Sequence, residues 1–331
     1  MRDVAALAEV GLKTVSRVFN DVPTVDPLLV TRVRSAAAKL GYRPNLNASS
    51  LRRGDRRTAT IGLLLEDVAN PFSGVLHRAV EDVARARNVL LLTGSVDEDP
   101  IREQHLAQAL IDRRVDGLII VPVGHDHSYL ILEQRAGTPI VFVDREPSLL
   151  GGDAVVSANQ TGASDAVRHL LSAGHRRIGY LGDLIKISTA RDRFRGYCDA
   201  LAAAGLPVDE AIVRHGLTTV KDAEQASNEL LRSDKPPTAL FASQNLVTIG
   251  AVRALRDTRT QDRTALVGFD DFLLADLLQP AVTVVRQDVS EMGKQAALML
   301  FDRIDGVTHT PQSRVLPTTL IPRGSGEIAG P

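Results

Sequence analysis

The sequence predicts an α/β protein in two parts, a small helical head followed by a larger body with two parallel β-sheets. Residues 1–44 carry three short helical patterns with punctuated ends. From Thr60 onward, short apolar runs alternate with helical patterns, in two successive sets. The length of 331 residues suits two or three domains, and 44% hydrophobic with 24% charged residues is an ordinary globular composition.

The first two helical patterns are separated by a glycine. Asp3–Glu9 form the first, with Val4 and Leu7 at helical spacing, and Leu12–Phe19 form the second. Gly11 lies between them, and a helix, a glycine-containing turn and a second helix make the helix-turn-helix pattern. The second helix of that motif enters the DNA major groove by its N-terminal end.

The third helical pattern has clear ends. Asp26 is a candidate N-cap, Pro27 suits the first helical position, and Gly41 follows the last apolar residue. We expect a buried stripe along this helix made of Val30, Val33, Ala37 and Leu40.

The N-terminal end of the second helix carries candidate base-contacting residues. Lys13 and Arg17 are four residues apart and share a face, and both side chains can donate to guanine. Leu12 can contact a thymine methyl group. Polar groups suited to phosphate oxygens are Thr14, Ser16 and Asn20. A small helical bundle with exposed basic residues is the alternative interpretation.

Charge is distributed unevenly along the chain. Residues 1–57 contain 11 Lys and Arg against 5 Asp and Glu, a balance of +6, so the other 274 residues carry −7 of the total −1. A basic module on a slightly acidic body indicates that the module meets a polyanion. A solvated basic face is the alternative.

The body contains two sets of buried-strand patterns. The first set is Ile61–Leu65, Val89–Leu92, Gly117–Val121 and Ile140–Val143, with helical stretches at 72–87 and 101–113. The second set is Arg177–Leu181, Thr238–Phe241, Ala265–Val267 and Thr283–Val285. This rhythm predicts a doubly wound parallel sheet, repeated once.

Several classes of site are disfavoured. Cys198 is the only cysteine, so the chain has no internal disulfide and no multi-cysteine zinc site. The chain has no G-x-G-x-x-G, P-loop, G-x-S-x-G or H-E-x-x-H motif. His125 and His127 have a metal-like spacing without a third ligand nearby, and we interpret them as a solvated loop. We therefore expect no cofactor and no metal. With no signal peptide and no long apolar run, the expected location is cytoplasmic.

The head resembles the DNA-binding head of the lac repressor (LacI/GalR) family. The resemblance rests on DVAALAEVGLKTVSRVFND, then V-D-P-x-x-x-x-R-V, then AAAKLGYRPNLNASSLRRG. It implies that Leu12, Lys13 and Arg17 contact bases. In the family a serine that caps the second helix and contacts a phosphate usually stands at the position of Gly11. We therefore expect the second helix to be positioned less firmly on the DNA backbone. The residues that usually precede the first helix are missing before Met1, so either the true start lies earlier or that helix frays.

Residues 45–59 link the head to the body. Asn45 can cap a short helix from Leu46 to Leu51, which alone would be unstable in water. The resemblance implies a hinge helix that orders when two copies meet over the minor groove, with Leu51 wedged between base pairs, Ala48 beside it and Arg52 along phosphates. A flexible linker is the alternative.

The resemblance continues through the body, in the stretches DGLIIVP, PIVFVDRE, GHRRIGYLGD, ALFASQN, VGFDD and LPTTLIPRGS. It implies two periplasmic-binding-protein-like lobes between which the chain crosses three times. The first lobe would be 60–157 plus 287–311, and the second 158–284 plus 313–326. No heptad tail follows, which favours a homodimer over a tetramer.

A two-lobed α/β sensor binds its ligand beyond the carboxyl ends of its strands. Candidates there are Asp67, Asn70, Phe72, Asp144, Arg145, Arg193, Gln244, Asn245 and Asp270. The resemblance favours Phe72, Arg193, Gln244 and Asp270 as effector-binding residues. For each, an interlobe salt bridge or a strand-end cap is the alternative. The resemblance favours a carbohydrate effector, with a purine or a phosphorylated sugar as alternatives.

Together these observations predict a homodimeric, sequence-specific transcriptional regulator, a repressor of a near-palindromic operator, controlled by a small-molecule effector and without a membrane partner. Two other classes stay open. One is a solute sensor without a DNA role, and the other is an α/β enzyme that uses Asp270 or Asp271 on a sugar.

Overall fold

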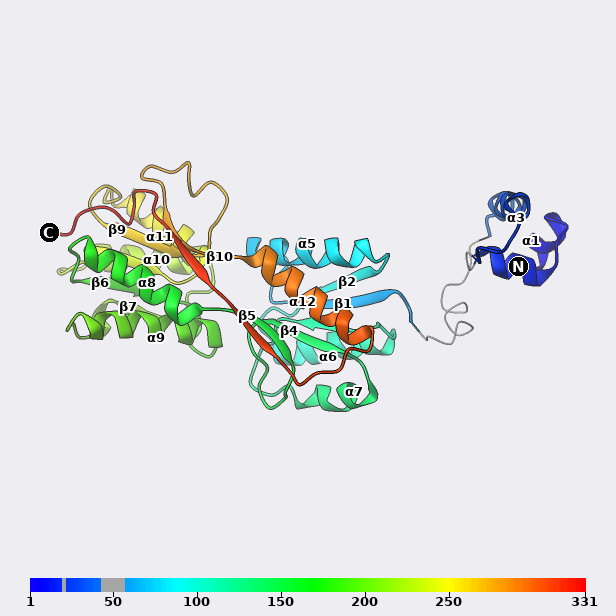
Figure 1. Ribbon diagram of the computed structural model, residues 1–331. Helices are drawn as coiled ribbons and strands as arrows, with labels where there is room; N and C mark the ends of the chain where they lie inside the picture. Colours follow the sequence, from blue (N-terminus) through cyan, green and yellow to red (C-terminus); the bar gives the residue numbers. More distant parts are fainter. Residues whose placement is uncertain (20–21, 43–56) are drawn as a thin grey trace. The chain divides into compact units, whose positions relative to one another are not determined.

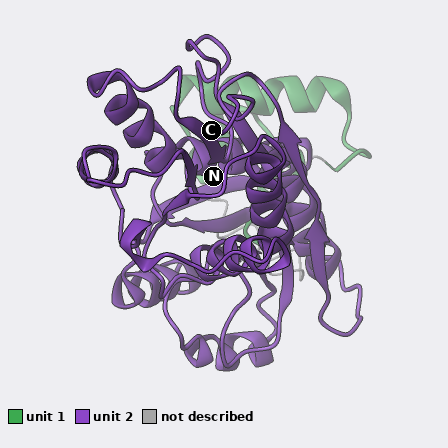
Figure 2. Ribbon diagram, turned by 90° about the vertical axis from the view of Figure 1, so that its left-hand side faces the viewer, with its two compact units in different colours: residues 1–59 green, residues 60–331 purple. Residues whose placement is uncertain are grey.

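The computed structural model describes residues 1–19, 22–42 and 57–331. The chain divides into two compact units, Met1–Ala59 and Thr60–Pro331 (Figures 1 and 2). We call the first unit the head and the second the body, and each is treated by itself below.

The described part of the head contains α1 (Arg2–Leu7), α2 (Leu12–Phe19) and α3 (Pro27–Lys39). The bounds of α2 confirm the sequence prediction. The start of α3 also confirms it, because Asp26 caps the helix by accepting a hydrogen bond from the backbone N–H of Leu28 at 2.7 Å, with Pro27 in the first turn.

A small apolar core joins the three helices of the head. It is formed by Val4 of α1, Val15 and Val18 of α2, and Val33 and Ala37 of α3, all buried. The α1–α2–α3 arrangement presents the opposite face of α2 to solvent. A shared core of this kind fixes α2 against its neighbours, as a recognition helix requires.

Two details of the head differ from the prediction. Helix α1 ends at Leu7, before the predicted Glu9, because Glu9 has a left-handed backbone with φ 52° that cannot continue a right-handed helix. Leu40 is 47% exposed and does not join the buried stripe. Helix α3 ends at Lys39, and Gly41, with φ 59°, turns the chain just after it. Within the described part of the head, the side chain of Leu40 is therefore left exposed.

The first lobe of the body is a six-stranded parallel sheet in the order β11-β5-β4-β3-β1-β2. The strands are β1 (Thr60–Leu65), β2 (Leu90–Ser95), β3 (Leu118–Ile120), β4 (Ile140–Asp144), β5 (Asp153–Ser157) and β11 (Ser313–Leu316). Its α-helices are α5 (Pro71–Ala86), α6 (Pro100–Asp112), α7 (Ile131–Ala136) and α12 (Val289–Ile304). A short 3₁₀ turn, Ser128–Leu130, precedes α7.

The second lobe repeats this plan in the order β12-β10-β9-β8-β6-β7, with β12 antiparallel. The strands are β6 (Ile178–Leu181), β7 (Val213–Arg214), β8 (Ala239–Ala242), β9 (Ala265–Phe269), β10 (Thr283–Gln287) and β12 (Thr318–Ile321). Its α-helices are α8 (Asn159–Ser172), α9 (Ser188–Ala203), α10 (Val220–Leu231) and α11 (Asn245–Asp257). A 3₁₀ turn, Glu210–Ile212, precedes β7.

Both lobes are doubly wound, which confirms the predicted fold class. Helices α5 and α12 share one core on one face of the first sheet, and α6 contributes to a second core on the other face (Figure 1). In the second lobe, α8 and α9 cover one face while α10 and α11 cover the other. The central strands are buried on both faces, which explains why they are continuous apolar runs in the sequence.

The chain crosses between the lobes three times, after β5, after β10 and between β11 and β12 (Figure 1). The assignment of residues 313–326 to the second lobe is therefore wrong for Ser313–Leu316, which form β11 and pair with β5 of the first lobe. The third crossing lies against the first, because the Ala158 N–H donates to the Leu316 carbonyl at 2.9 Å.

Candidate functional site: an interlobe pocket and an exposed helix of the head

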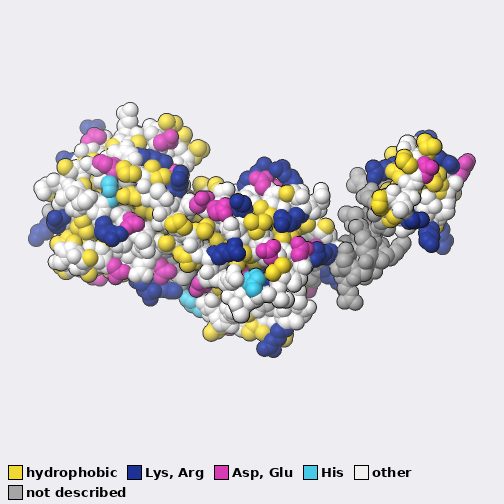
Figure 3. Space-filling model, viewed as in Figure 1, with side chains coloured by type: hydrophobic (Ala, Val, Ile, Leu, Met, Phe, Trp, Pro, Cys, Tyr) yellow, Lys and Arg dark blue, Asp and Glu magenta, His cyan; other side chains and the backbone are white. Residues whose placement is uncertain are grey.

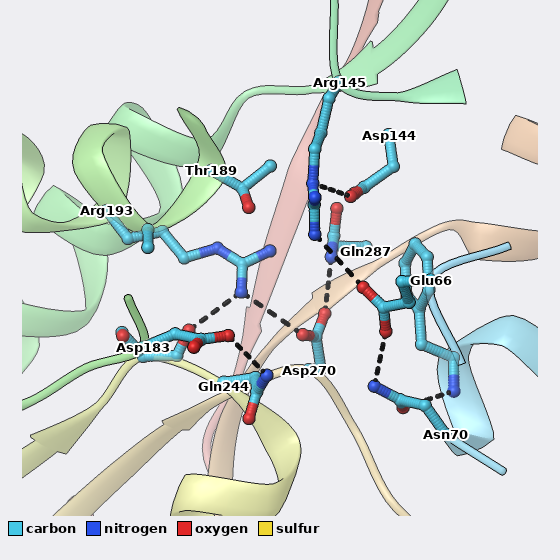
Figure 4. A pocket seen from close by; sticks show the side chains of 13 residues that line it. Glu66, Asn70, Asp144, Arg145, Asp183, Thr189, Arg193, Gln244, Asp270 and Gln287 are labelled. Atoms are coloured by element: carbon cyan, nitrogen blue, oxygen red, sulfur yellow. Dashed lines mark hydrogen bonds and ion pairs between the residues drawn. The ribbon is translucent and has the colours of Figure 1, made fainter. Parts of the chain in front are cut away.

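A polar pocket lies between the two lobes, at the carboxyl ends of their strands (Figure 4). Its free volume is about 30 Å³ in this arrangement of the lobes, so a ligand larger than a water molecule requires the lobes to open or side chains to move. In a doubly wound sheet this edge is where ligands bind, because adjacent loops diverge there. The pocket is lined by Glu66, Asn70, Phe72, Asp144, Arg145, Asp183, Thr189, Ala190, Arg193, Ser243, Gln244, Asp270 and Gln287.

Arg193 organises the second-lobe wall of the pocket. It lies in the second turn of α9 and is 6% exposed. Its Nε donates to Asn159 Oδ1 at 2.7 Å, and its Nη1 donates to the Ser243 carbonyl at 2.8 Å and to Asp270 Oδ2 at 3.4 Å. The guanidinium also lies over the Phe269 ring, 3.9 Å from the centroid. The cation is thus fixed in one orientation without a ligand.

Asp270 is held from two sides. Besides the contact with Arg193, its Oδ1 accepts a hydrogen bond from Gln287 Nε2 at 2.5 Å. Asp270 comes directly after β9 and has a left-handed backbone with φ 69°. Aspartate tolerates that conformation better than most residues, and the sharp turn directs its carboxylate into the pocket (Figure 4).

Arg145 organises the first-lobe wall. The residue is 6% exposed, and its guanidinium makes two hydrogen bonds to Glu98, at 2.6 and 3.1 Å. Its Nη2 also donates to Glu66 Oε2 at 3.2 Å, and its Nε lies 3.4 Å from Asp144 Oδ2. Three carboxylates therefore surround one cation, and this wall carries an excess of negative charge.

Burial shifts the ionisation of the carboxylates in this pocket. It raises the pKa of Glu66 to about 7, although the positive charge of Arg145 acts against the shift. Burial likewise raises the pKa of Asp144 and of Asp183 above the ordinary value of an aspartate. Burial therefore makes negative charge on these acids more costly than in water, unless a cation lies close to them.

Three hydrogen bonds tie the pocket wall together, one across the lobes and two within them. Asn245 Nδ2, from the second lobe, donates to Asn70 Oδ1 of the first lobe at 2.8 Å, and Asn70 Nδ2 donates to Glu66 Oε1 at 2.7 Å. Within the second lobe, Gln244 Nε2 donates to Asp183 Oδ2 at 2.9 Å. The Asn245–Asn70 bond links the lobes in this state.

The four residues assigned to effector binding in the sequence, Phe72, Arg193, Gln244 and Asp270, all line this pocket. Of the other strand-end candidates, Asn70, Asp144 and Arg145 line it too. Asp67 does not, because it accepts a hydrogen bond from the Ala69 N–H at 2.8 Å and shapes the turn before α5.

Sequence reasoning missed several residues of the site, among them Glu66, Glu98, Asp183, Asn159 and Gln287. Glu66 directly follows β1 and Asp183 lies two residues after β6, so the rule that selected Asp144 could have found both. Glu98 stands in the run Asp97–Glu98–Asp99, a pattern typical of an acidic turn. Nothing in its local sequence indicates the contact with Arg145, which lies 47 residues away.

The predicted base-contacting residues lie on the solvent-facing side of α2. Leu12 is 47% exposed, Lys13 and Arg17 are exposed, and Thr14 and Ser16 are partly buried. Arg17 Nη2 donates to Thr24 Oγ1 at 2.9 Å. Figure 3 shows Lys and Arg side chains at the surface of the head in that view. The predicted DNA contacts Asn20, Asn45, Ala48, Leu51 and Arg52 lie outside the described residues.

The interpretation of His125 and His127 as a solvated loop is wrong for His127, whereas His125 is exposed as expected. The residue is 1% exposed, its Nδ1 accepts a hydrogen bond from the Ser148 N–H at 3.0 Å, and its Nε2 lies 3.6 Å from Glu103 Oε1. Apolar neighbours bury it, including the Phe142 ring. Within residues 1–19, 22–42 and 57–331, no group of three or more His, Cys, Asp or Glu side chains has the arrangement of a metal site.

No helix in the described segments combines the length and the apolar character that crossing a bilayer needs.

A helix-turn-helix head and a two-lobed body with a polar interlobe pocket define a class of protein, the ligand-responsive DNA-binding regulators. Comparison with known families agrees. Residues 1–45 match the model described as "Bacterial regulatory proteins, lacI family", and residues 167–326 match the "Periplasmic binding protein-like domain".

The chain is also similar over nearly its whole length to characterised regulators. It is 34% identical to the HTH-type transcriptional regulator GalR of Salmonella typhimurium strain LT2, over 98% of this chain and 95% of that protein. The chain belongs to the lacI family and is a transcriptional regulator.

Two solved structures extend the comparison. The structure named as a complex of the transcriptional regulator CelR with cellobiose has a TM-score of 0.74 at 32% identity and covers 98% of each chain. The lac repressor dimer, solved with operator and an anti-inducer, has a TM-score of 0.84 at 24% identity, also over 98% of each chain, and is a likeness of fold.

Proposed function

We propose that this regulator binds a near-palindromic operator through α2 and that a small molecule in the interlobe pocket controls that binding. The observation that carries the proposal is the pairing, in one chain, of exposed cations on α2 with a pocket whose arginines are already fixed in place. Lys13 and Arg17 would donate to guanines in the major groove, Leu12 would contact a thymine methyl group, and Thr14 and Ser16 would contact phosphates.

The remaining DNA contacts are assigned by sequence alone. Asn20 and Asn45 would contact phosphates, and Leu51 would insert between base pairs of the minor groove with Ala48 beside it and Arg52 along the backbone. Insertion of this kind bends the duplex and requires two hinge segments to meet, which makes a homodimer part of the proposal.

Exposed apolar side chains support a homodimer. Val75 of α5, Leu90 of the edge strand β2 and Ile101 of α6 are 48%, 61% and 66% exposed. In the second lobe, Leu273 and Leu277 are 84% and 71% exposed. Exposed apolar side chains gathered near a sheet edge are typical of a surface that another chain covers. The similar lac repressor was solved as a dimer on its operator.

The effector would bind Arg193, Asp270, Gln244 and Phe72. A carboxylate and a guanidinium together suit adjacent hydroxyl groups, because Asp270 accepts O–H bonds and Arg193 donates N–H bonds. Phe72 offers an apolar face to a ring. These features support a carbohydrate as the effector, and the CelR structure contains cellobiose.

Control would act through the opening of the two lobes. The three crossings lie side by side, so they form a hinge, and the Asn245–Asn70 bond is a direct contact between the two lobes. A ligand that bridges the lobes favours the closed state and changes the spacing of the first-lobe surfaces that pair in the dimer. The proposal includes binding without turnover, and action in the cytoplasm, where the operator lies.

Selection from random oligonucleotides tests the DNA-binding part. We expect the full-length protein to enrich a near-palindromic sequence, and the Lys13→Ala variant to enrich a related sequence with relaxed preference at one position in each half-site. No enrichment by the wild-type protein would reject operator binding and leave only a ligand-binding body.

A further inference from the structure

The pocket between the lobes has an excess of hydrogen-bond acceptors. Four carboxylates line it, from Glu66, Asp144, Asp183 and Asp270. Two amide oxygens add to them, because Gln244 Oε1 and Gln287 Oε1 are buried and have no partner, whereas one buried donor of the lining residues, Arg145 Nε, lacks a hydrogen-bond partner and lies 3.4 Å from Asp144 Oδ2. A ligand that fills this space without unpaired polar groups must present donors to these atoms.

The orientation of both amides is fixed by their neighbours. Gln287 is 4% exposed, and its Nε2 donates to Asp270 Oδ1. Turning the amide over would place an oxygen against a carboxylate oxygen and remove that bond. The same argument holds for Gln244, whose Nε2 donates to Asp183 Oδ2. Each amide therefore keeps its oxygen free for a ligand.

The charges of the pocket are also unbalanced, because acids outnumber cations just as acceptors outnumber donors. The four lining carboxylates and Glu98, which pairs with Arg145, make five acids, whereas Arg145 and Arg193 are the two cations of the lining set. Both guanidinium groups are already engaged with carboxylates of the protein. An anionic ligand would have to displace those carboxylates, and a cationic ligand would offset their excess.

We propose that the effector is a hydroxyl-rich compound that carries an amino group, an amino sugar or a related polyhydroxylated amine, with its ammonium group held beside Glu66. The proposal rests on the proposed function, because it names the chemical class of the ligand of the same pocket. Glu66 is the suited recipient, since its Oε1 and Oε2 accept from Asn70 and Arg145 and each oxygen can accept one further bond.

Ionisation in the pocket supports this choice. Burial holds the pKa of Glu66, Asp144 and Asp183 above ordinary values in the ligand-free state. An ammonium group within a few ångströms favours the ionised carboxylate. Binding of the amine should therefore release protons near pH 7, and binding of a neutral sugar should not.

An adjoining pocket supplies the contrast. It shares Arg145 with the first pocket, and its wall carries Lys186, Arg191 and His125 beside Glu98 and Glu146. Within the described residues, Lys186 and Arg191 of this wall form no ion pair with a carboxylate, so the wall would favour an anion such as a sugar phosphate. The first pocket therefore favours a cationic ligand and the adjoining pocket an anionic one. Ligands that differ only in charge distinguish the two pockets.

The test uses the full-length protein and three sets of ligands. Each set contains one sugar in its neutral, amino and 6-phosphate forms: glucose, glucosamine and glucose 6-phosphate, and the same forms of galactose and mannose. Binding is measured by thermal shift and by calorimetry in two buffers of different ionisation enthalpy. We expect one amino sugar to bind about tenfold or more tightly than its neutral form, with proton release, and the phosphate form to bind weakest. Glu66→Gln should reduce the ratio of the affinity for the amino sugar to the affinity for its neutral form. Glu146→Gln, the matched control in the adjoining pocket, should keep the preference.

Each other outcome overturns the inference. Tightest binding by a phosphate form would assign the ligand to the adjoining pocket and leave the proposed regulator intact. Equal binding of amino and neutral forms would remove the role of charge. Stabilisation by no member of the series would reject the ligand class, and operator selection then decides separately whether the regulator itself stands. Melting of Glu66→Gln at the wild-type temperature or above excludes misfolding as the cause of a lost preference.

Discussion

Asp144 and Asp270 occupy equivalent positions in the two lobes and have the same backbone φ of 69°. Asp144 ends β4 and Asp270 follows β9, and these are the corresponding strands of the two sheets. Each carboxylate lies beside an arginine, Arg145 for Asp144 and Arg193 for Asp270. The pocket is thus built from two similar turns, one from each lobe, that meet across the ligand space.

The left-handed turn at Asp144 gives a stability prediction. Asp144→Asn keeps a residue that tolerates φ above zero and removes a charge that burial penalises, so it should be at least as stable as wild type at pH 8. Asp144→Ala should be less stable than Asp144→Asn by about 1 kcal/mol, the cost of a left-handed backbone with a plain Cβ. Urea unfolding of both variants provides the measurement. Equal stabilities would show that the turn carries no strain.

Glu66 predicts a pH dependence of stability. Its pKa is raised by burial from 4.5 to about 7, so the folded state binds the proton more tightly than the unfolded state. Its contribution to folding is complete below pH 4.5 and is lost as pH rises towards 7, by roughly 3 kcal/mol in total. In chemical unfolding between pH 5 and 8, Glu66→Gln should lose this part of the slope. The same slope in the variant and the wild type would assign it to other groups.

Substitution of Arg193 should separate the response to effector from operator binding. Arg193→Ala removes the donor that holds Asp270, Asn159 and the Ser243 carbonyl, so the effector should no longer change operator affinity. Operator binding itself should persist, because the head is a separate unit. Titration of labelled operator with and without effector checks both statements. Arg195→Ala, an exposed arginine on the same helix, is the control, and a wild-type effector response in Arg193→Ala would contradict the assignment.

The basic head predicts a strong dependence of DNA affinity on salt, because bound Lys and Arg displace counterions from phosphates. Lys13→Ala and Arg17→Ala should each weaken operator binding by about 1–3 kcal/mol, the usual value of a base contact. Lys221→Ala removes the same charge from the body and should have little effect. Gel-shift titrations at several salt concentrations compare the four proteins. Affinity that stays flat with salt would argue against binding through this face.

Leu51 gives a prediction that depends on sequence alone. If its side chain wedges between base pairs, Leu51→Ala should lose more affinity for the selected operator than for random DNA, because unstacking belongs to the specific complex. Competition titrations with both DNAs measure the ratio. Equal losses would reject the wedge.

Much of the fold was accessible from the sequence as apolar runs. Strands β1, β4 and β8 are buried on both faces and stand out in this way, and helix α5 begins within one residue of its predicted start. Four strands were not predicted: β7 has two residues, β11 and β12 are edge strands that are not fully buried, and β5 is buried but begins and ends with the polar residues Asp153 and Ser157. Their pairing depends on tertiary contacts that local pattern does not encode.

Only part of the pocket could be predicted from the sequence, because some of its contacts join residues that lie far apart in the chain. Residues directly after strands, such as Asp144 and Asp270, could be selected by position. Glu98 and Asn159 reach their arginines across 47 and 34 residues of sequence, and no local signal marks such contacts. Leu40 was placed in the core because apolar character alone does not reveal that a helix ends one residue earlier.

The three crossings have a consequence for how this chain can be shortened. Because α12 and β11 return to the first lobe after the second lobe has been built, neither lobe corresponds to one uninterrupted stretch of gene. A premature stop codon anywhere before β11 removes the edge strand that pairs with β5, and one before α12 also uncovers a face of the sheet that carries Glu66 and Asp144. A protease that cuts the first crossing, by contrast, produces two polypeptides, and the packing of α12 and β11 against the rest of the first lobe is then what holds them together.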